Sequence, residues 1–321
     1  MFLNPPLPSS APSQLRWGQL HGAATALAIA ETAQRSNCPL LVIAAGAREA
    51  ERLQGEIAVF APRDLPVQLF PDWETLPYDL FAPHPDIVSQ RLATLHGLPQ
   101  LARGVVLVSL ATLLQRLPPR QWIDGHVLDL ATGDRLDLAS FRDRLIAAGY
   151  AHVAQVTSHG EFAVRGSLLD IYPMGSDRPV RIDLFDDRID SIRIFDPETQ
   201  RSTGQYERLR LLPAREYPLD AQGVRDFRGR YRVRFEGDPN RSAVYRQVSD
   251  GIAPAGIEYY LPLFYDQLES LFDYLPSGTV LIDTADMGAR AGLLWNEIIE
   301  RYEQRRHDVE RAMTAHGAAR P

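Results

Sequence analysis

Three arginines and one phenylalanine between residues 159 and 202 are the side chains best suited to chemistry at a surface. In the strand patterns of this segment, Arg165, Arg181, Phe185 and Arg193 fall on the side that should point to water. A guanidinium group makes forked hydrogen bonds to carboxylates, and arginine and aromatic residues are enriched at protein-binding hot spots. The pattern predicts a protein-binding patch, and a solvated face with an incidental aromatic is the alternative.

Period-two alternation assigns the faces of the strands that carry these residues. In residues 162–168, the outward positions are Ala163, Arg165 and Ser167, and the inward positions are Phe162, Val164, Gly166 and Leu168. In residues 180–185, the outward positions are Arg181, Asp183 and Phe185, and the inward positions are Val180, Ile182 and Leu184. The arginines and the phenylalanine are therefore expected on one face of a sheet.

The register of the next strand follows from the loop length. If Asp186–Asp187–Arg188 form a three-residue hairpin loop, Asp190, Ile192 and Ile194 continue the inner face. A two-residue loop would set Ile182 against Ser191, so burial favours the longer loop. Arg181 then lies opposite Arg193, and Asp183 is the nearby acid expected to offset the two like charges.

The absence of lysine excludes several kinds of catalysis. All 34 basic residues are arginine, so no lysine can reach the phosphates of a bound nucleotide or form a Schiff base. Residues 22–30, where a phosphate-binding loop would precede the first helix, have no Gly-Lys-Ser/Thr. The eight histidines have no metal-ligand spacing. We therefore predict no catalytic residue, no cofactor and no metal site.

Two acidic segments resemble parts of a nucleotide motor. Residues 280–283 form an apolar strand that ends in Asp283, as in a Walker B motif, but Thr284 stands where a catalytic glutamate would follow. Asp283 could bind magnesium, yet without a phosphate loop it has nothing to bridge, so a helix-capping role is favoured. Residues 72–75 (DWET) look like a helicase acidic box but follow Pro71 in a proline-rich loop.

Arginines are dense between residues 225 and 234. The segment RDFRGRYRVRF places them at a spacing of two, which predicts several on one face of a strand: Arg228, Arg230, Arg232 and Arg234, with Arg225 nearby. Contact with nucleic acid is one interpretation. A solvated face or ion pairs within the chain are the favoured alternative.

Composition places the chain among ordinary globular proteins. It has 321 residues, 45% hydrophobic and 23% charged, with a net charge of −7 that gives no global attraction to nucleic acid or membrane. Cys38, the single cysteine, is expected in the core and fits a reducing compartment. No signal peptide or membrane-spanning stretch is recognised, so a cytoplasmic protein is predicted.

Helix and strand patterns alternate in the first third and predict an open parallel α/β sheet. Short strands without intervening helices follow, and then helical patterns and a last buried strand at 278–283. This order predicts an α/β fold interrupted by an inserted α+β domain. The expected domains are 1–122, 123–212 and 213–321, with a frayed C-terminal tail from residue 296.

Five stretches resemble the N-terminal part of the bacterial transcription-repair coupling factor family (Mfd) and, more distantly, the excision-repair subunit UvrB. They are LFPDWETLPYDLFAPHPDIVSQRLATL (69–95), VVLVSLATLLQRLPP (105–119), GEFAVRGSLLDIYPMGS (160–176), PVRIDLFDDRIDSIRIFDPETQRS (179–202) and GIEYY (256–260). UvrB carries a working phosphate loop and a long DNA-clamping hairpin, and this sequence has neither.

The resemblance implies a degenerate UvrB-like, helicase-like nucleotide fold in two halves around an inserted domain that recruits UvrA. It implies UvrA contacts at Arg165, Arg181 and Phe185; Arg193 and Asp183 are further candidates from the alternation. It also implies masking of this surface by the C-terminal domain of the full-length protein, and it assigns ATP-driven translocation and the binding of RNA polymerase and DNA to later domains. A UvrB-like DNA-damage-binding ATPase module and a passive DNA-binding domain are the alternative functions.

Overall fold

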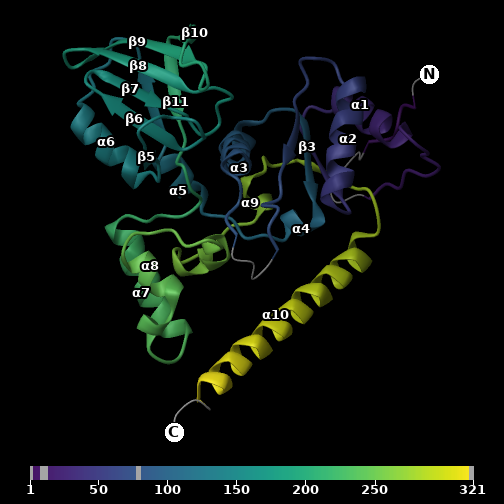
Figure 1. Cartoon of the computed structure of the whole chain (residues 1–321). Helices are drawn as coiled ribbons and strands as arrows, with labels where there is room; N and C mark the ends of the chain where they lie inside the picture. Colours follow the sequence, from purple (N-terminus) through teal and green to yellow (C-terminus); the bar gives the residue numbers. More distant parts are fainter. Residues whose placement is uncertain (1–2, 8–13, 77–80, 318–321) are drawn as a thin grey trace.

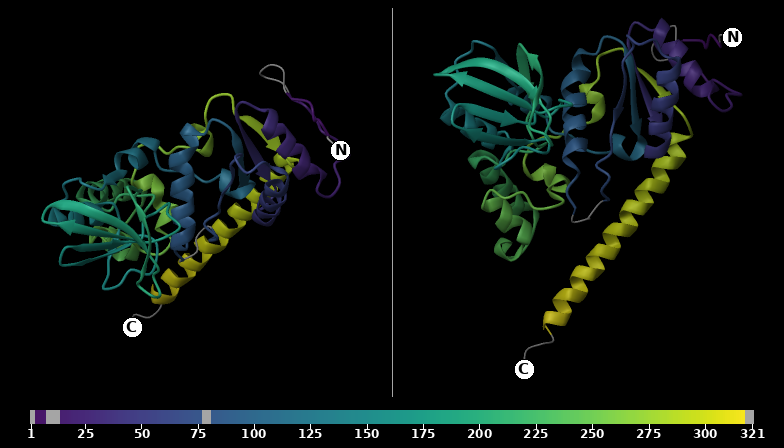
Figure 2. Two further views of the ribbon diagram at one scale, coloured as in Figure 1. Left: turned by 90° about the horizontal axis from the view of Figure 1, so that it is seen from above. Right: turned by 45° about the horizontal axis from the view of Figure 1, so that its top comes forward.

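The computed structural model describes residues 3–7, 14–76 and 81–317, with side chains to residue 304. Residues 77–80, within the first stretch of the family resemblance, lie outside the described part. Three units are visible in Figures 1 and 2: a parallel α/β unit, a second unit built on a six-stranded sheet, and a small helical unit. The predicted α/β class, with a parallel sheet and additional strands, is confirmed.

Four parallel strands form the first sheet, in the order β12-β1-β3-β2. They are β12 (Val280–Asp283), β1 (Pro39–Ala44), β3 (Gly104–Ser109) and β2 (Val67–Phe70). Strands β1 and β3 are buried along their whole length, because helices cover both faces. Their side chains alternate between two cores: Leu40 and Val42 pack toward one, and Leu41 and Ile43 toward the other.

Each face of this sheet has its own helices. The first core contains residues of α1 (Ala24–Arg35) and α2 (Ala47–Phe60). The second contains residues of α3 (Pro85–Gly97), the short 3-10 helix η1 (Leu98–Gln100) and α4 (Leu110–Leu113). Cys38 is half-buried just before β1 and not in the core as expected.

Strand β12 closes the sheet after the inserted unit, as predicted. It is the outermost strand and pairs only with β1 among the described strands. The expectation of a buried strand is wrong, because Leu281 is 52% exposed on this uncovered edge.

The inserted unit begins after α5 (Arg120–Gly125) and is entered and left through two paired strands. Strand β4 (Leu128–Ala131) pairs antiparallel with β11 (Arg208–Leu211), so the entering and leaving chains lie side by side. Between them lies a six-stranded sheet in the order β10-β9-β8-β7-β6-β5. Its strands are β5 (Ala151–His152), β6 (Glu161–Arg165), β7 (Leu168–Ile171), β8 (Val180–Phe185), β9 (Arg188–Phe195) and β10 (Ser202–Tyr206).

Helix α6 (Leu138–Ala147) covers one face of the six-stranded sheet. Phe141 and Leu145 of this helix join a buried cluster that includes Leu169, Ile182 and Ile192 of the sheet. Asp137 begins the helix by accepting hydrogen bonds from the backbone N–H groups of residues 139 and 140. The opposite face of the sheet carries the arginines singled out above.

Helices form the third unit, and the prediction of a strand for its arginine-rich segment is wrong. Residues Ala221–Arg234 form α7, which Asp220 caps through the Gly223 N–H. Phe227 and Tyr231, four residues apart, pack into an aromatic cluster, which outweighs the period-two arginines. The unit also contains η2 (Pro239–Arg241), α8 (Ala243–Ser249) and η3 (Ile257–Leu263).

The chain returns to the first unit through α9 (Leu271–Tyr274) and β12, and it continues into α10 (Met287–Gly317). Figure 1 shows α10 extending away from the body of the molecule. The expected frayed tail from residue 296 is therefore helical as far as residue 317. Within the described residues, we find no helix with the length and hydropathy to cross a membrane.

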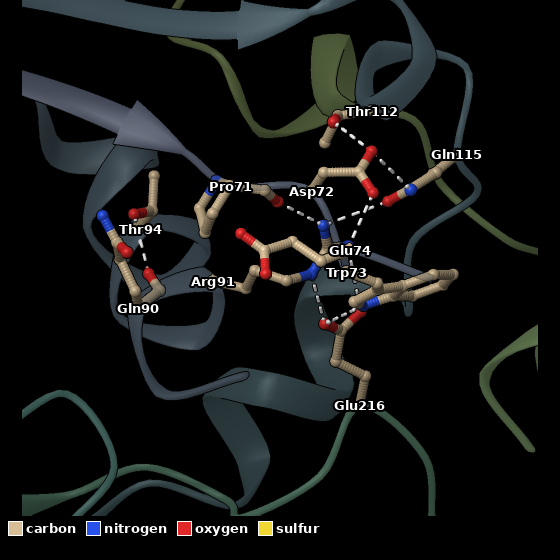
Figure 3. Close-up of polar contacts among 10 residues, drawn as sticks. All are labelled: Pro71, Asp72, Trp73, Glu74, Gln90, Arg91, Thr94, Thr112, Gln115 and Glu216. Atoms are coloured by element: carbon tan, nitrogen blue, oxygen red, sulfur yellow. Dashed lines mark hydrogen bonds and ion pairs between the residues drawn. The ribbon is translucent and has the colours of Figure 1, made fainter. Parts of the chain in front are cut away.

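A buried ion pair joins the first unit to the segment that leaves the inserted one (Figure 3). Arg91 of α3 is fully buried, and its Nε lies 2.7 Å from Oε1 of Glu216, which is also buried. The guanidinium carbon lies 4.5 Å from the centre of the Phe70 ring and 4.6 Å from that of the Trp73 ring. The indole Nε1 of Trp73 donates to the same Glu216 oxygen at 3.2 Å.

The DWET segment is part of this joint and not a helicase box. Asp72 accepts hydrogen bonds from Thr112 Oγ1 at 2.7 Å and from Gln115 Nε2 at 3.3 Å, which fixes it to the α4 region. Arg91 donates to the backbone oxygen of Pro71 at 2.8 Å. The side chains of Asp72 and Trp73 thus hold the loop after β2 in place.

A small cavity of about 190 Å³ lies where the three units meet. Glu258 of η3 lines it and is buried, and its Oε2 has no hydrogen-bond partner among the described residues. Burial raises the pKa of Glu258 to about 7; the Glu216 charge adds to this rise, while Arg91 and Arg215 oppose it.

We expect Glu216→Gln to destabilise the protein by about 3 kcal/mol or more, because Arg91 would remain buried without its counter-charge. Arg210→Ala, which breaks the exposed Arg210–Asp129 pair, should cost no more than about 1 kcal/mol. Urea unfolding of both variants measures the difference. Equal shifts in the two midpoints would contradict the role of the buried pair.

The stability of the chain should fall as pH rises from about 5 to 7 because of Glu258. Its carboxyl keeps a proton in the folded state over a range where the unfolded chain has lost it, so folding becomes less favourable by up to about 3 kcal/mol. Glu258→Gln removes this term and should be more stable than the native chain at pH 8. If the unfolding midpoints of the two proteins changed in parallel from pH 5 to 8, the proposed effect of Glu258 on stability would be refuted.

Candidate functional site

The face of the six-stranded sheet opposite α6 brings the predicted residues together, although Val153 and Val156 cover the part of it that carries Ala163 and Phe195. Arg165 of β6 is followed across the sheet by Leu168 of β7 and Asp183 of β8. In the neighbouring row, Asp170 of β7 lies beside Arg181 of β8, which lies beside Arg193 of β9. The predicted pairing of Arg181 with Arg193 and of Ile182 with Ile192 is confirmed.

The hairpin loop differs from the predicted one. Phe185 pairs with Arg188, so Asp186 and Asp187 alone form the loop, and a bulge lies between the pairs Asp183–Ser191 and Leu184–Ile189. Asp190 is the additional residue that the bulge accommodates in β9. Ile189 is therefore buried and Asp190 is exposed, so placing Asp190 on the inner face was wrong.

The single strand predicted over 162–168 is two strands. Residues 161–165 form β6 and residues 168–171 form β7, joined at Gly166, whose φ of +62° favours glycine. Arg165 nevertheless remains exposed on the expected face, at the end of β6. Its Nη2 donates to the backbone oxygen of Ala154 at 3.0 Å, and among the described residues it has no ion-pair partner.

Phe185 is the most exposed aromatic side chain of the hairpin. It ends β8 with 74% of its surface exposed. The following residue, Asp186, has a φ of +55°, a left-handed conformation suited to a tight two-residue turn. A large apolar side chain is thus held in solvent by an ordered strand.

Arg181 is held by a carboxylate that the sequence reasoning missed. Its Nε and Nη2 lie 2.6 and 2.8 Å from the two oxygens of the buried Asp170, an arrangement that keeps the pKa of Arg181 above its usual value. The guanidinium carbon also lies 5.0 Å from the centre of the Phe195 ring. In the sequence, the presence of Asp170 within the otherwise apolar run LLDI (168–171) could have indicated a buried charge that needs a partner.

Arg193 is paired with Asp183, the acid expected between the two arginines. The Nη2 of Arg193 bonds an Asp183 oxygen that also accepts from Ser191 Oγ at 3.0 Å. The Nε of Arg193 is buried and has no hydrogen-bond partner among the described residues. The like charges of Arg181 and Arg193 are therefore offset by two separate aspartates.

Asp283 is exposed at the end of β12, and Thr284 Oγ1 beside it donates to the backbone oxygen of Ile43 at 3.2 Å. The carboxylate that accepts a hydrogen bond at the start of α10 is Asp286, which bonds the Ala289 N–H at 3.1 Å. The helix-capping role favoured for Asp283 thus belongs to Asp286. No cluster of three or more potential metal ligands occurs in the described part of the chain.

Comparison with known proteins gives matches of two kinds, to a domain family and to whole proteins. Residues 128–217 match the family described as UvrB interaction domain, from the first residue of β4 to just beyond β11. The whole chain is similar to proteins named transcription-repair-coupling factor. Identity is 45% over 308 residues for Escherichia coli K12, 42% over 315 for Haemophilus influenzae and 27% over 280 for Bacillus subtilis 168.

These alignments cover 96, 97 and 82% of this chain but only 27, 27 and 23% of the relatives, so the chain spans about a quarter of their length. The likeness is continuous through all three units. The chain is accordingly homologous to the N-terminal region of the transcription-repair-coupling factors, and its residues 128–217 form a UvrB interaction domain.

Proposed function

We propose that the outward face of the six-stranded sheet, opposite α6, is a non-catalytic docking surface for UvrA, through which the chain recruits nucleotide excision repair to sites of stalled transcription. The observation that carries this proposal is the 74% exposure of Phe185 at the tip of an ordered hairpin beside arginine side chains. The names of the relatives and of the matching domain support the same partner.

The arginines contribute to docking in different ways. Arg165 has the least constrained guanidinium of the three and can make two parallel hydrogen bonds to a carboxylate of the partner. Arg181 and Arg193 are paired with Asp170 and Asp183, and their side chains are 16% and 37% exposed, so each offers only part of its guanidinium, held in a defined position with little loss of side-chain entropy on binding. Phe185 supplies the apolar area, and burying it would exclude water from the neighbouring polar contacts.

The absence of lysine supports a non-catalytic role, together with the exposed position of Asp283 next to Thr284. In this proposal, ATP-driven translocation and the binding of RNA polymerase belong to the parts of the longer relatives that this chain does not span. Masking of the docking face by the C-terminal domain of the full-length protein and a cytoplasmic location belong to the same proposal.

Arg165→Ala combined with Phe185→Ala should abolish binding to UvrA, because removal of a central hot-spot residue typically costs about 2 kcal/mol or more. Both side chains are exposed, so the thermal melt should hardly change. Co-elution with UvrA on a sizing column measures the effect. The control is Arg144→Ala with Phe272→Ala, which also removes one positive charge and one exposed phenylalanine ring but at positions elsewhere. Retained binding by the first variant refutes the surface.

Arg181→Ala should weaken UvrA binding and also destabilise the chain by roughly 2 kcal/mol or more, because Asp170 would stay buried without a counter-charge. Arg181→Ala with Asp170→Ala should recover part of the stability and none of the binding. Urea unfolding and UvrA co-elution, measured on both variants, separate the two effects. Recovery of binding in the double variant would show that Arg181 acts only within the fold.

A further inference from the structure

Helix α7 carries five arginines, and three of them have structural roles. Arg228 and Arg232 lie over the ring of Tyr245, with guanidinium carbons 5.9 and 5.7 Å from its centre. Arg230 pairs with Asp266 and donates to the backbone oxygen of Leu263. These contacts fasten α7 to α8 and to η3, so they account for the presence of these three side chains.

Arg225 and Arg234 have no carboxylate partner among the described residues. Arg225 donates to Gln222 Oε1 at 2.6 Å, and Arg234 lies with its guanidinium carbon 5.8 Å from the centre of the Phe235 ring. The helix dipole favours a cation at Arg234 in the last turn, but it gives no stabilisation to Arg225 in the second turn. Fold stability therefore leaves Arg225 unexplained.

The two arginines line one groove together with Arg230. The groove has a volume of about 560 Å³ and is bounded by α7 and η3; its lining is Arg225, Asp226, Gly229, Arg230, Val233, Arg234, Pro262 and Leu263. Gly229 leaves its centre open, because a Cβ there would meet no atom within 4 Å. Asp226 accepts from Gln222 Nε2 at 2.9 Å and removes part of the positive charge, and Arg230 is paired with Asp266, so Arg225 and Arg234 supply the positive charge that has no carboxylate partner.

The spacing and chemistry of the two arginines suit a phosphate backbone. Arg225 and Arg234 are nine positions apart in α7, or about two and a half turns, so they leave opposite sides of the helix, about 14 Å apart along its axis, and flank the groove. Successive phosphates of one DNA strand are spaced about 3.4 Å along the axis, so this distance spans roughly four phosphate spacings. Val233, which is 91% exposed, and Pro262 supply apolar surface beside the cations, as contact with deoxyribose requires.

We propose that the α7 groove binds the phosphodiester backbone of DNA without sequence preference, through Arg225 and Arg234. This surface lies in the helical unit, well away from the six-stranded sheet in both Figure 1 and the right-hand view of Figure 2. DNA contact here is therefore separate from the proposed docking of UvrA. It gives the chain a second surface that can touch the DNA on which repair is assembled.

The test is fluorescence anisotropy of a labelled 20-base-pair duplex titrated with the whole chain between 50 and 200 mM salt. Arg225→Gln with Arg234→Gln should weaken binding at least tenfold at low salt and lower the slope of log affinity against log salt by about 2. Arg225→Lys with Arg234→Lys should keep that slope, because it keeps both charges. Arg48→Gln with Arg144→Gln makes the same change in net charge at exposed positions outside the groove and should bind like the native chain.

Absence of binding by the native chain at 50 mM salt overturns the proposal, as does equal binding by the groove and control variants. Stronger binding of an acidic peptide than of the duplex would assign the groove to a protein instead. Inorganic polyphosphate as competitor and a single-stranded 20-mer as second probe distinguish duplex DNA from other phosphate chains. Co-elution with UvrA should be unchanged in the groove variant, so failure here does not bear on the sheet surface.

Discussion

The buried pair of Arg91 and Glu216 is the constraint on which the arrangement of the units depends. It joins α3 of the parallel unit to the segment that has just left the inserted unit, inside a layer made by Phe70 and Trp73. Two buried charges are costly to desolvate, so the pair gains little stability over apolar packing. It strongly penalises any other arrangement, because separating the partners would leave each charge uncompensated.

The position of the inserted unit follows from this joint and from the pairing of β4 with β11. Paired entry and exit strands allow a whole domain to be inserted without interrupting the parallel sheet, which β12 then completes beside β1. Because α6 covers one face of the six-stranded sheet, the other face points outward, apart from the area that Val153 and Val156 cover. The exposed side chains of Arg165 and Phe185 on that face are held by strands of the sheet.

The internal ion pairs on this face are compatible with the docking proposed for it. Asp170 and Asp183 hold Arg181 and Arg193 at fixed positions, whereas Arg165 and Phe185 lack such restraint from charged groups. A preorganised set of charges next to an exposed aromatic combines a low entropy cost with apolar area. The arginines of α7 in the helical unit also differ in role. Some of them hold α7 to its neighbours, and others line an open groove.

The sequence by itself determined that Arg165, Arg181 and Phe185 point outward. Period-two alternation within each strand places them opposite the apolar side chains, and the apolar runs predict the strands of the parallel sheet. Four other features could be established only from the tertiary structure. The bulge that buries Ile189, the pairing of Arg181 with Asp170, the edge position of β12 and the helix at 221–234 all depend on contacts between segments distant in sequence. Such contacts are selected by burial and charge compensation across the whole fold, which a local pattern does not contain.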